Sequence, residues 1–223
     1  MIPWWQQIFW LALWVGGVLG IAQQLALRGT REEYIRKFVH IGTGNIILLA
    51  WALDTPLWLA LGFGIVFSAV TLLSYRVNIL SSINSVNRKS WGTFFYALSI
   101  TLLIGIFWSR SEPLIAALGI LIMTWGDAFA ALVGQAWGRR TYHVFGVKKT
   151  LEGSLAMGLV SFVVCILLLG FVYGVRIEVL GCAMLLATTA TALETLSVAG
   201  IDNLTVPLGS AILGSWLIRH FLV

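Results

Sequence analysis

The sequence predicts an all-α fold, a polytopic membrane bundle of about eight transmembrane helices, with seven as the alternative. Apolar residues make up 59% of the 223 residues, whereas charged residues make up only 10%. Apolar runs of about 20 residues, the length that crosses a bilayer as a helix, recur along the whole chain. No connection between them has room for a soluble domain, so residues 1–223 are predicted to form a single transmembrane domain.

The expected spans follow one another closely. They cover residues 4–27, 38–53, 56–75, 92–108, 113–134, 153–174, 177–198 and 204–220. The first run lacks a basic leading segment and a small-residue cleavage site, so we expect a retained span and not a cleaved signal peptide. The second is short and contains His40, Thr43 and Asn45, which indicates a tilted or incomplete span. Residues 139–149 are expected to form a polar loop without a strand.

Basic residues lie mostly on one side of the predicted membrane. Loops after the odd-numbered spans hold eleven of the 14 Lys and Arg residues, and the opposite side holds Arg110, Arg176 and Arg219. Lys and Arg favour the cytoplasmic side of a membrane. Both termini are therefore expected outside, the polar loops are expected in the cytoplasm, and nucleic acid is not an expected partner.

Residues 123–154 contain an unusual combination of groups. Asp127 is a single carboxylate in an apolar run, where an ionisable side chain is costly and usually functional. Lys148 and Lys149 follow in the polar loop and could neutralise a phosphate, while Asp127 could bind a cation. Alternatively, Gly134 and its small neighbours could only let helices pack closely in lipid, and the lysines could only fix topology.

The next span opens with Thr150, Glu152, Gly153 and Ser154. The free N–H groups at the start of a helix can bind a phosphate. The alternative is structural: Thr150 could cap the helix, and Glu152 could interact favourably with its dipole.

Two further basic clusters could contact phosphate. Arg36 and Lys37 lie four and three residues before His40, so the three side chains can share one helical face. Asn87 and Arg88 lie in a polar loop and could contact a phosphate or a base. The alternatives are a topology anchor with a packed histidine in the first case and a solvated loop in the second.

A last candidate cluster contains Glu194, Asp202 and Asn203. Glu194 could bind a second cation or act as a base for a hydroxyl nucleophile. Alternatively, Glu194 could lie at the membrane interface and Asp202 could cap the final helix. All these clusters fall on the predicted cytoplasmic side, which favours a soluble cytosolic substrate.

These motifs resemble those of the phytol kinase, dolichol (polyprenol) kinase and CTP-dependent diacylglycerol kinase group, and more distantly the membrane phosphatidate cytidylyltransferases. The resemblance rests on Arg36-Lys37-x-x-His40, Asn87-Arg88-Lys89-Ser90-x-Gly92, Gly126-Asp127-Ala128, Lys148-Lys149-Thr150-x-Glu152-Gly153-Ser154, and Glu194 through Asp202-Asn203 to Pro207. It implies an integral-membrane enzyme that transfers the γ-phosphoryl group of CTP to a lipid alcohol with Mg²⁺.

The resemblance also assigns roles. Asp127, Lys149 and Glu194 are expected to be catalytic, with Asp127 and Glu194 as ligands of Mg²⁺. The expected nucleotide and phosphate contacts are Arg36, Lys37, His40, Asn87, Arg88, Gly126, Gly134, Lys148, Thr150, Glu152, Gly153, Ser154, Asp202 and Asn203. We expect an isoprenoid alcohol such as phytol or geranylgeraniol as the acceptor and CTP, or else ATP, as the donor.

Three alternatives stay open from the sequence. A diacylglycerol kinase or a cytidylyltransferase would keep the fold and change the substrate or the reaction. A transporter is less favoured, because transporters place charge near the membrane midplane between repeated halves, and neither feature is visible here.

The charge distribution makes a testable prediction about topology. Single cysteines introduced at Thr141 and Ser109, in a background without Cys165 and Cys182, should react with impermeant thiol reagents from opposite sides of the membrane. Labelling of both positions from the same side would contradict the eight-span arrangement.

Overall fold

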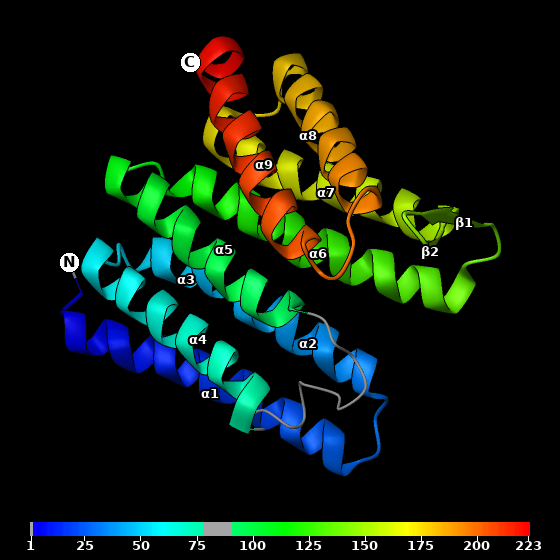
Figure 1. Cartoon of the computed structure of the whole chain (residues 1–223). Coiled ribbons are helices and arrows are strands. Elements are labelled where there is room, and N and C mark those ends of the chain that lie inside the picture. Colours follow the sequence, from blue (N-terminus) through cyan, green and yellow to red (C-terminus); the bar gives the residue numbers. More distant parts are fainter. Residues whose placement is uncertain (1, 78–90) are drawn as a thin grey trace.

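The computed structural model describes residues 2–77 and 91–223, and these residues are almost entirely helical (Figure 1). The helices are α1 (Trp4–Leu27), α2 (Glu32–Gly44), α3 (Ile46–Ala52), α4 (Leu57–Val77), α5 (Gly92–Phe107), α6 (Pro113–Trp137), α7 (Leu151–Tyr173), α8 (Ile177–Thr195) and α9 (Asp202–Leu217). Strands β1 (Thr141–Val144) and β2 (Val147–Thr150) lie between α6 and α7. The predicted all-α fold is confirmed, apart from this short hairpin.

Within the described ranges, six helices are long and apolar enough to cross a membrane: α1, α4, α5, α6, α7 and α8. The protein is therefore a multi-pass membrane protein. The outer helices expose large apolar side chains, such as Phe9 on α1 and Phe171 on α7, as expected for surfaces that face lipid. Because α2, α3 and α9 are shorter, the count of eight spans stays a prediction.

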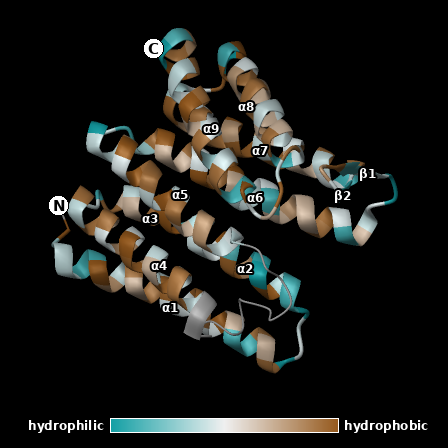
Figure 2. Ribbon diagram, viewed as in Figure 1, coloured by the Kyte–Doolittle hydropathy of each residue, from teal (hydrophilic) through white to brown (hydrophobic). Residues whose placement is uncertain are grey.

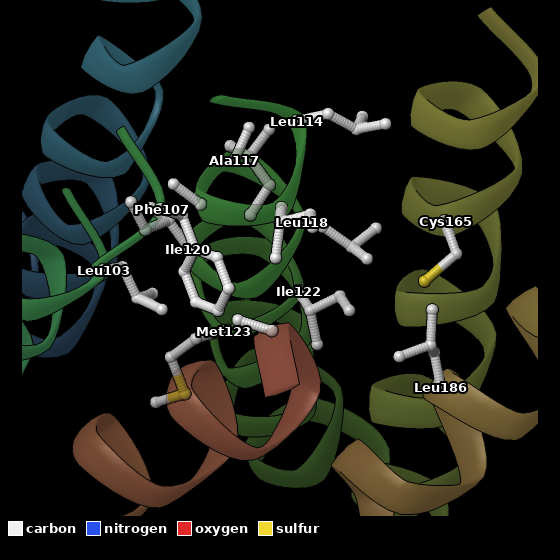
Figure 3. Close-up of a cluster of buried hydrophobic side chains, with 14 of the residues drawn as sticks. Leu103, Phe107, Leu114, Ala117, Leu118, Ile120, Ile122, Met123, Cys165 and Leu186 are labelled. Carbon is white, nitrogen blue, oxygen red and sulfur yellow. The ribbon is translucent and has the colours of Figure 1, made fainter. Parts of the chain in front are cut away.

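Helix α6 forms the centre of the bundle. Its apolar residues surround the whole helix, and Leu118, Ile120 and Ile122 are fully buried. Figure 3 shows these side chains packed with neighbours such as Cys165 and Leu186. A helix that is apolar on all sides is stable only when other helices cover it.

Small residues bring α7 close to α6. A Cβ atom on Gly126 would lie 2.5 Å from Met157 Sδ, and one on Gly134 would lie 2.8 Å from Thr150 Oγ1. Both distances are too short for real contacts. The structure therefore gives these two glycines a role in helix packing, as small residues commonly have in membranes.

The second span was predicted to be tilted or incomplete, and the structure shows it divided into two helices. Helix α2 ends at Gly44, α3 begins at Ile46, and the Asn45 side-chain oxygen accepts a hydrogen bond of 3.1 Å from Trp125 Nε1. The first part also starts six residues earlier than position 38, at Glu32. Arg36, Lys37 and His40 consequently lie within a helix and not at its start.

The prediction that residues 139–149 form a loop without a strand is wrong, because residues 141–150 form a β-hairpin. β1 and β2 pair antiparallel, with Thr141 opposite Thr150. Phe145 and Gly146 form the turn and have φ values of 47° and 78°, the left-handed backbone that two-residue hairpin turns need. β2 leads directly into α7, where Thr150 Oγ1 accepts a hydrogen bond of 3.1 Å from Gly153 N, so the predicted cap is confirmed.

The chain gathers its polar connections at one end of the bundle. In Figure 1 the α1–α2 connection, the hairpin and the α8–α9 connection lie on the same side, away from both termini. Figure 2 shows hydrophilic residues concentrated at this end, near α2 and the hairpin. The motifs that are far apart in sequence can therefore contribute to one site.

Candidate functional site

A cavity of about 560 Å³ opens at this polar end of the bundle. Its walls come from α2, α6, the hairpin, the start of α7 and the α8–α9 connection. The predicted site residues that line it are Arg36, Lys37, Asp127, Gly134, Lys148, Lys149, Thr150, Gly153, Ser154, Glu194, Asp202 and Asn203. Four separate motifs thus meet in a single cavity, whose size is within the range of small-molecule sites.

An ion pair between Lys37 and Asp127 forms one wall of the cavity. Lys37 Nζ donates a hydrogen bond of 2.5 Å to Asp127 Oδ2 and a longer one of 3.3 Å to the Asp127 main-chain oxygen. The two side chains are only 4% and 17% exposed. A buried charge without a partner is strongly unfavourable, so each residue stabilises the charged form of the other.

A second ion pair joins the hairpin to the end of α8. Lys149 Nζ donates to Glu194 Oε1 at 2.6 Å and to the Glu194 main-chain oxygen. Beside this pair, the hydroxyl groups of Tyr142 and Ser154 lie 2.5 Å apart. The contacts hold β2 against α8 and fix the ammonium group of Lys149 at the cavity wall. Lys148, by contrast, is exposed.

Positive and negative groups balance around this cavity. Among the described lining residues, Arg36, Lys37, Lys148 and Lys149 are cationic, while Glu33, Asp127, Glu194 and Asp202 are carboxylates. A triphosphate that entered without a cation would meet these carboxylates as well as the lysines. A metal-bound triphosphate suits such a mixed lining better. The carboxylates can then bind the metal ion while the cationic side chains contact the phosphate oxygens.

Asp202 is the carboxylate best placed to accept a cation. Its side chain makes no ion pair within the part of the chain that the structure describes, and it accepts hydrogen bonds only from Asn203. Burial, with the nearby charge of Asp127, raises the pKa of Asp202. Asp202 is also the first residue of α9 and follows the cap Ile201, so the alternative that it caps this helix is wrong.

Other predicted residues lie outside this cavity. Glu152 instead accepts hydrogen bonds of 3.2 and 3.3 Å from Arg140 N, which tie the hairpin to α7. Gly126 packs under Met157, and His40 lines a second, smaller cavity behind Lys37. Asn87 and Arg88 lie outside the described residues.

Sequence reasoning missed two contributors. Glu33 lines the cavity and holds Arg36 through an ion pair of 2.6 Å; the spacing of three residues on a helix was the available signal. Tyr142 became relevant only through the hairpin, which brings its hydroxyl group to Ser154. No feature of an isolated loop sequence indicates that contact.

Comparison with known proteins gives the family. The chain is 47% identical over 220 residues to the phytol kinase of Synechocystis sp., an alignment that covers 97% of this chain and 94% of that protein. The chain belongs to the phytol kinase family. It is also 32% identical over 218 residues to a probable phytol kinase 2 of Oryza sativa subsp. japonica, covering 89% of this chain and 71% of that protein. A probable phytol kinase of Triticum aestivum is 29% identical over 203 residues, covering 82% and 67% of the two chains.

No family model and no solved structure matches this chain. Membership in the phytol kinase family confirms the resemblance drawn from the motifs. It also confirms the predicted enzyme class, a phosphotransferase with an alcohol acceptor.

The buried pair predicts a specific pattern of stability in this kinase. Lys37→Met leaves Asp127 without its cation and should lower the free energy of unfolding by about 3–5 kcal/mol. The double variant Lys37→Met/Asp127→Asn should recover most of that loss, because no unpaired charge remains. Thermal or denaturant unfolding in mild detergent measures both.

The matched control is Arg219→Met, which breaks a more exposed pair with Glu112 of 2.9 Å. Its effect should stay within about 1 kcal/mol. Equal losses in Lys37→Met and Arg219→Met, or no recovery in the double variant, would contradict the structural role of the Lys37–Asp127 pair.

Proposed function

We propose that this protein is a CTP-dependent kinase of phytol or a similar isoprenoid alcohol such as geranylgeraniol, acting at the cytoplasmic face of the membrane. The observation that carries the proposal is the single cavity into which the basic and acidic motifs converge. The names of the relatives support an isoprenoid alcohol as the acceptor. The motif resemblance supports CTP as the donor.

Phosphoryl transfer requires positioning and charge neutralisation more than covalent chemistry from the protein. The alcohol oxygen bonds to the terminal phosphorus, the bond from that phosphorus to its bridging oxygen breaks, a nucleoside diphosphate leaves, and the hydroxyl proton is released. Arg36, Lys37, Lys148 and Lys149 are the cationic groups available to the phosphate oxygens. Lys149 is held in place by Glu194 and would not have to be ordered during the reaction.

The donor set fits Mg²⁺ that arrives with the nucleotide. No group of three or more His, Cys, Asp or Glu residues within the described ranges could hold a metal by itself. Mg²⁺ in nucleotide sites is typically bound by one or two carboxylates together with the phosphates. Asp127 and Asp202, which makes no ion pair with another described residue, would supply these ligands, and the ion would neutralise charge on the transferred phosphoryl group.

This arrangement revises the role proposed for Glu194. Its carboxylate oxygen is 2.6 Å from Lys149 Nζ, and the pair is nearly buried. We therefore assign Glu194 to positioning Lys149 and not to the metal. Lys37 would exchange Asp127 for a phosphate oxygen when the nucleotide binds, and Asp127 would then be free for the cation.

One assay tests the proposed function. Purified protein is offered phytol, geranylgeraniol, a dolichol and diacylglycerol, each with labelled CTP or ATP and Mg²⁺. We expect a phosphorylated isoprenoid alcohol and CDP as products. Preferential phosphorylation of diacylglycerol, use of ATP in place of CTP, or release of pyrophosphate would contradict the proposal.

The same assay tests the part of Asp127. Asp127→Asn should lower turnover by orders of magnitude, because a metal clamp contributes several kcal/mol to transition-state stabilisation. The variant should still fold and insert, although it leaves Lys37 without its partner and should lower the free energy of unfolding as Lys37→Met does; turnover is therefore compared under conditions where size-exclusion behaviour shows it to be folded. Near-normal turnover of this variant at saturating Mg²⁺ and nucleotide would remove Asp127 from the catalytic site.

A further inference from the structure

A small cavity of about 40 Å³ also borders the Lys37–Asp127 pair. It shares Arg36, Lys37, Asp127 and Asn203 with the large cavity. Its remaining lining comes from α2, α4 and α5: Val39, His40, Thr43, Phe67, Thr71, Gly92, Thr93 and Tyr96. The ion pair thus lines both a wide, charged cavity and a narrow one with a mixed lining.

We propose that this small cavity binds the hydroxymethyl end of the lipid alcohol. The inference rests on the proposed kinase function and deepens it, because it locates the acceptor. The hydroxyl oxygen would lie beside the Lys37–Asp127 pair, opposite the phosphates, as in-line transfer between donor and acceptor requires.

The size of the cavity selects the kind of alcohol. About 10–15 Å³ of such space holds one water molecule. A cavity of about 40 Å³ therefore accepts a hydroxymethyl group on an unbranched carbon. Diacylglycerol also ends in a hydroxymethyl group, but its next carbon carries an ester, which makes that end wider than the end of a prenol. The small volume therefore favours primary prenols over diacylglycerol.

His40 supplies the polar contact in this cavity. Its ring lies against Tyr96 with centroids 4.0 Å apart, and the Tyr96 hydroxyl donates a 3.1 Å hydrogen bond to the His40 main-chain oxygen. Nε2 lies 3.4 Å from Met123 O and 3.5 Å from Asp127 Oδ2. Both neighbours of Nε2 accept hydrogen bonds, so the tautomer with its hydrogen on Nε2 suits this site and leaves Nδ1 as an acceptor.

Within the described residues, His40 Nδ1 has no hydrogen-bond partner of its own. An alcohol hydroxyl that donates to Nδ1 would be held in one orientation, with a lone pair free to face the phosphorus. In this proposal His40 would contact the substrate itself.

The cavity also lies close to the lipid. Phe67 on α4 forms part of its wall, and the neighbouring residue Val66 is 62% exposed on the apolar surface of the bundle. Ile65 on the same turn is 58% exposed. An isoprenoid tail can therefore remain in the bilayer along α4 while its hydroxyl end occupies the cavity.

The first test changes the width of the cavity. Wild-type protein should phosphorylate a primary prenol at least about tenfold more efficiently than the same prenol with a methyl branch on the carbinol carbon, a difference typical of one extra methylene in a tight pocket. Phe67→Ala should reduce this preference by about tenfold without changing KM for CTP. Phe63→Ala, one turn earlier on α4 and outside the cavity lining, is the matched control.

The second test places the acceptor atom. Asn at position 40 can present an amide oxygen near the place of Nδ1, whereas Gln presents its amide near the place of Nε2. His40→Asn should therefore retain more activity than His40→Gln, and His40→Gln should raise KM for the alcohol while Kd for CTP with Mg²⁺ stays unchanged.

The outcomes separate this inference from the proposed function. If wild-type protein phosphorylates no alcohol, the kinase proposal fails, and the acceptor cavity with it. If wild-type protein is active but Phe67→Ala behaves like Phe63→Ala, or His40→Gln weakens CTP and not the alcohol, only the acceptor cavity is overturned. Circular dichroism and unfolding in detergent establish that each variant is folded.

Discussion

The ion pair between Lys37 and Asp127 is the contact on which the rest of this structure depends. It joins α2 to α6, the central helix, across 90 positions of the chain. Two charges this deeply buried are tolerated only in contact with each other. The pair therefore fixes the position of α2 against α6. Asn45, between α2 and α3, makes a further contact with α6 through its hydrogen bond from Trp125. Both cavities are lined by this pair.

In our proposal, this arrangement lets the protein join a water-soluble donor to a lipid acceptor. The large cavity lies at the polar end of the bundle and carries the cations that a triphosphate needs. The small cavity lies beside the exposed apolar surface of α4, which can contact a lipid tail. In our account the reacting atoms meet at the ion pair. The nucleotide can then remain in contact with water, and the lipid tail can remain in the bilayer.

Much of the fold could be predicted from the sequence, because a helix that crosses a bilayer must be apolar over about 20 residues. The long helices followed from apolar runs of sufficient length, and the unusual position of Asp127 and the irregular second span followed from single polar residues within such runs. The partners of those residues could not be predicted, since Lys37–Asp127 and Lys149–Glu194 form only when distant helices pack. The hairpin was missed because Phe145-Gly146 is a weak turn signal compared with the usual Asn-Gly.

The central claim is that the nucleotide binds at the Lys37–Asp127 pair. Equilibrium binding of CTP with Mg²⁺ to the double variant Lys37→Met/Asp127→Asn tests it most directly, because this variant keeps the packing and removes both charges. Arg139→Met, an exposed substitution outside the cavity lining, is the control. We expect the affinity of the double variant to fall at least about tenfold, or ~1.4 kcal/mol, and that of the control to be unchanged. Equal affinity in wild type and the double variant would contradict the account.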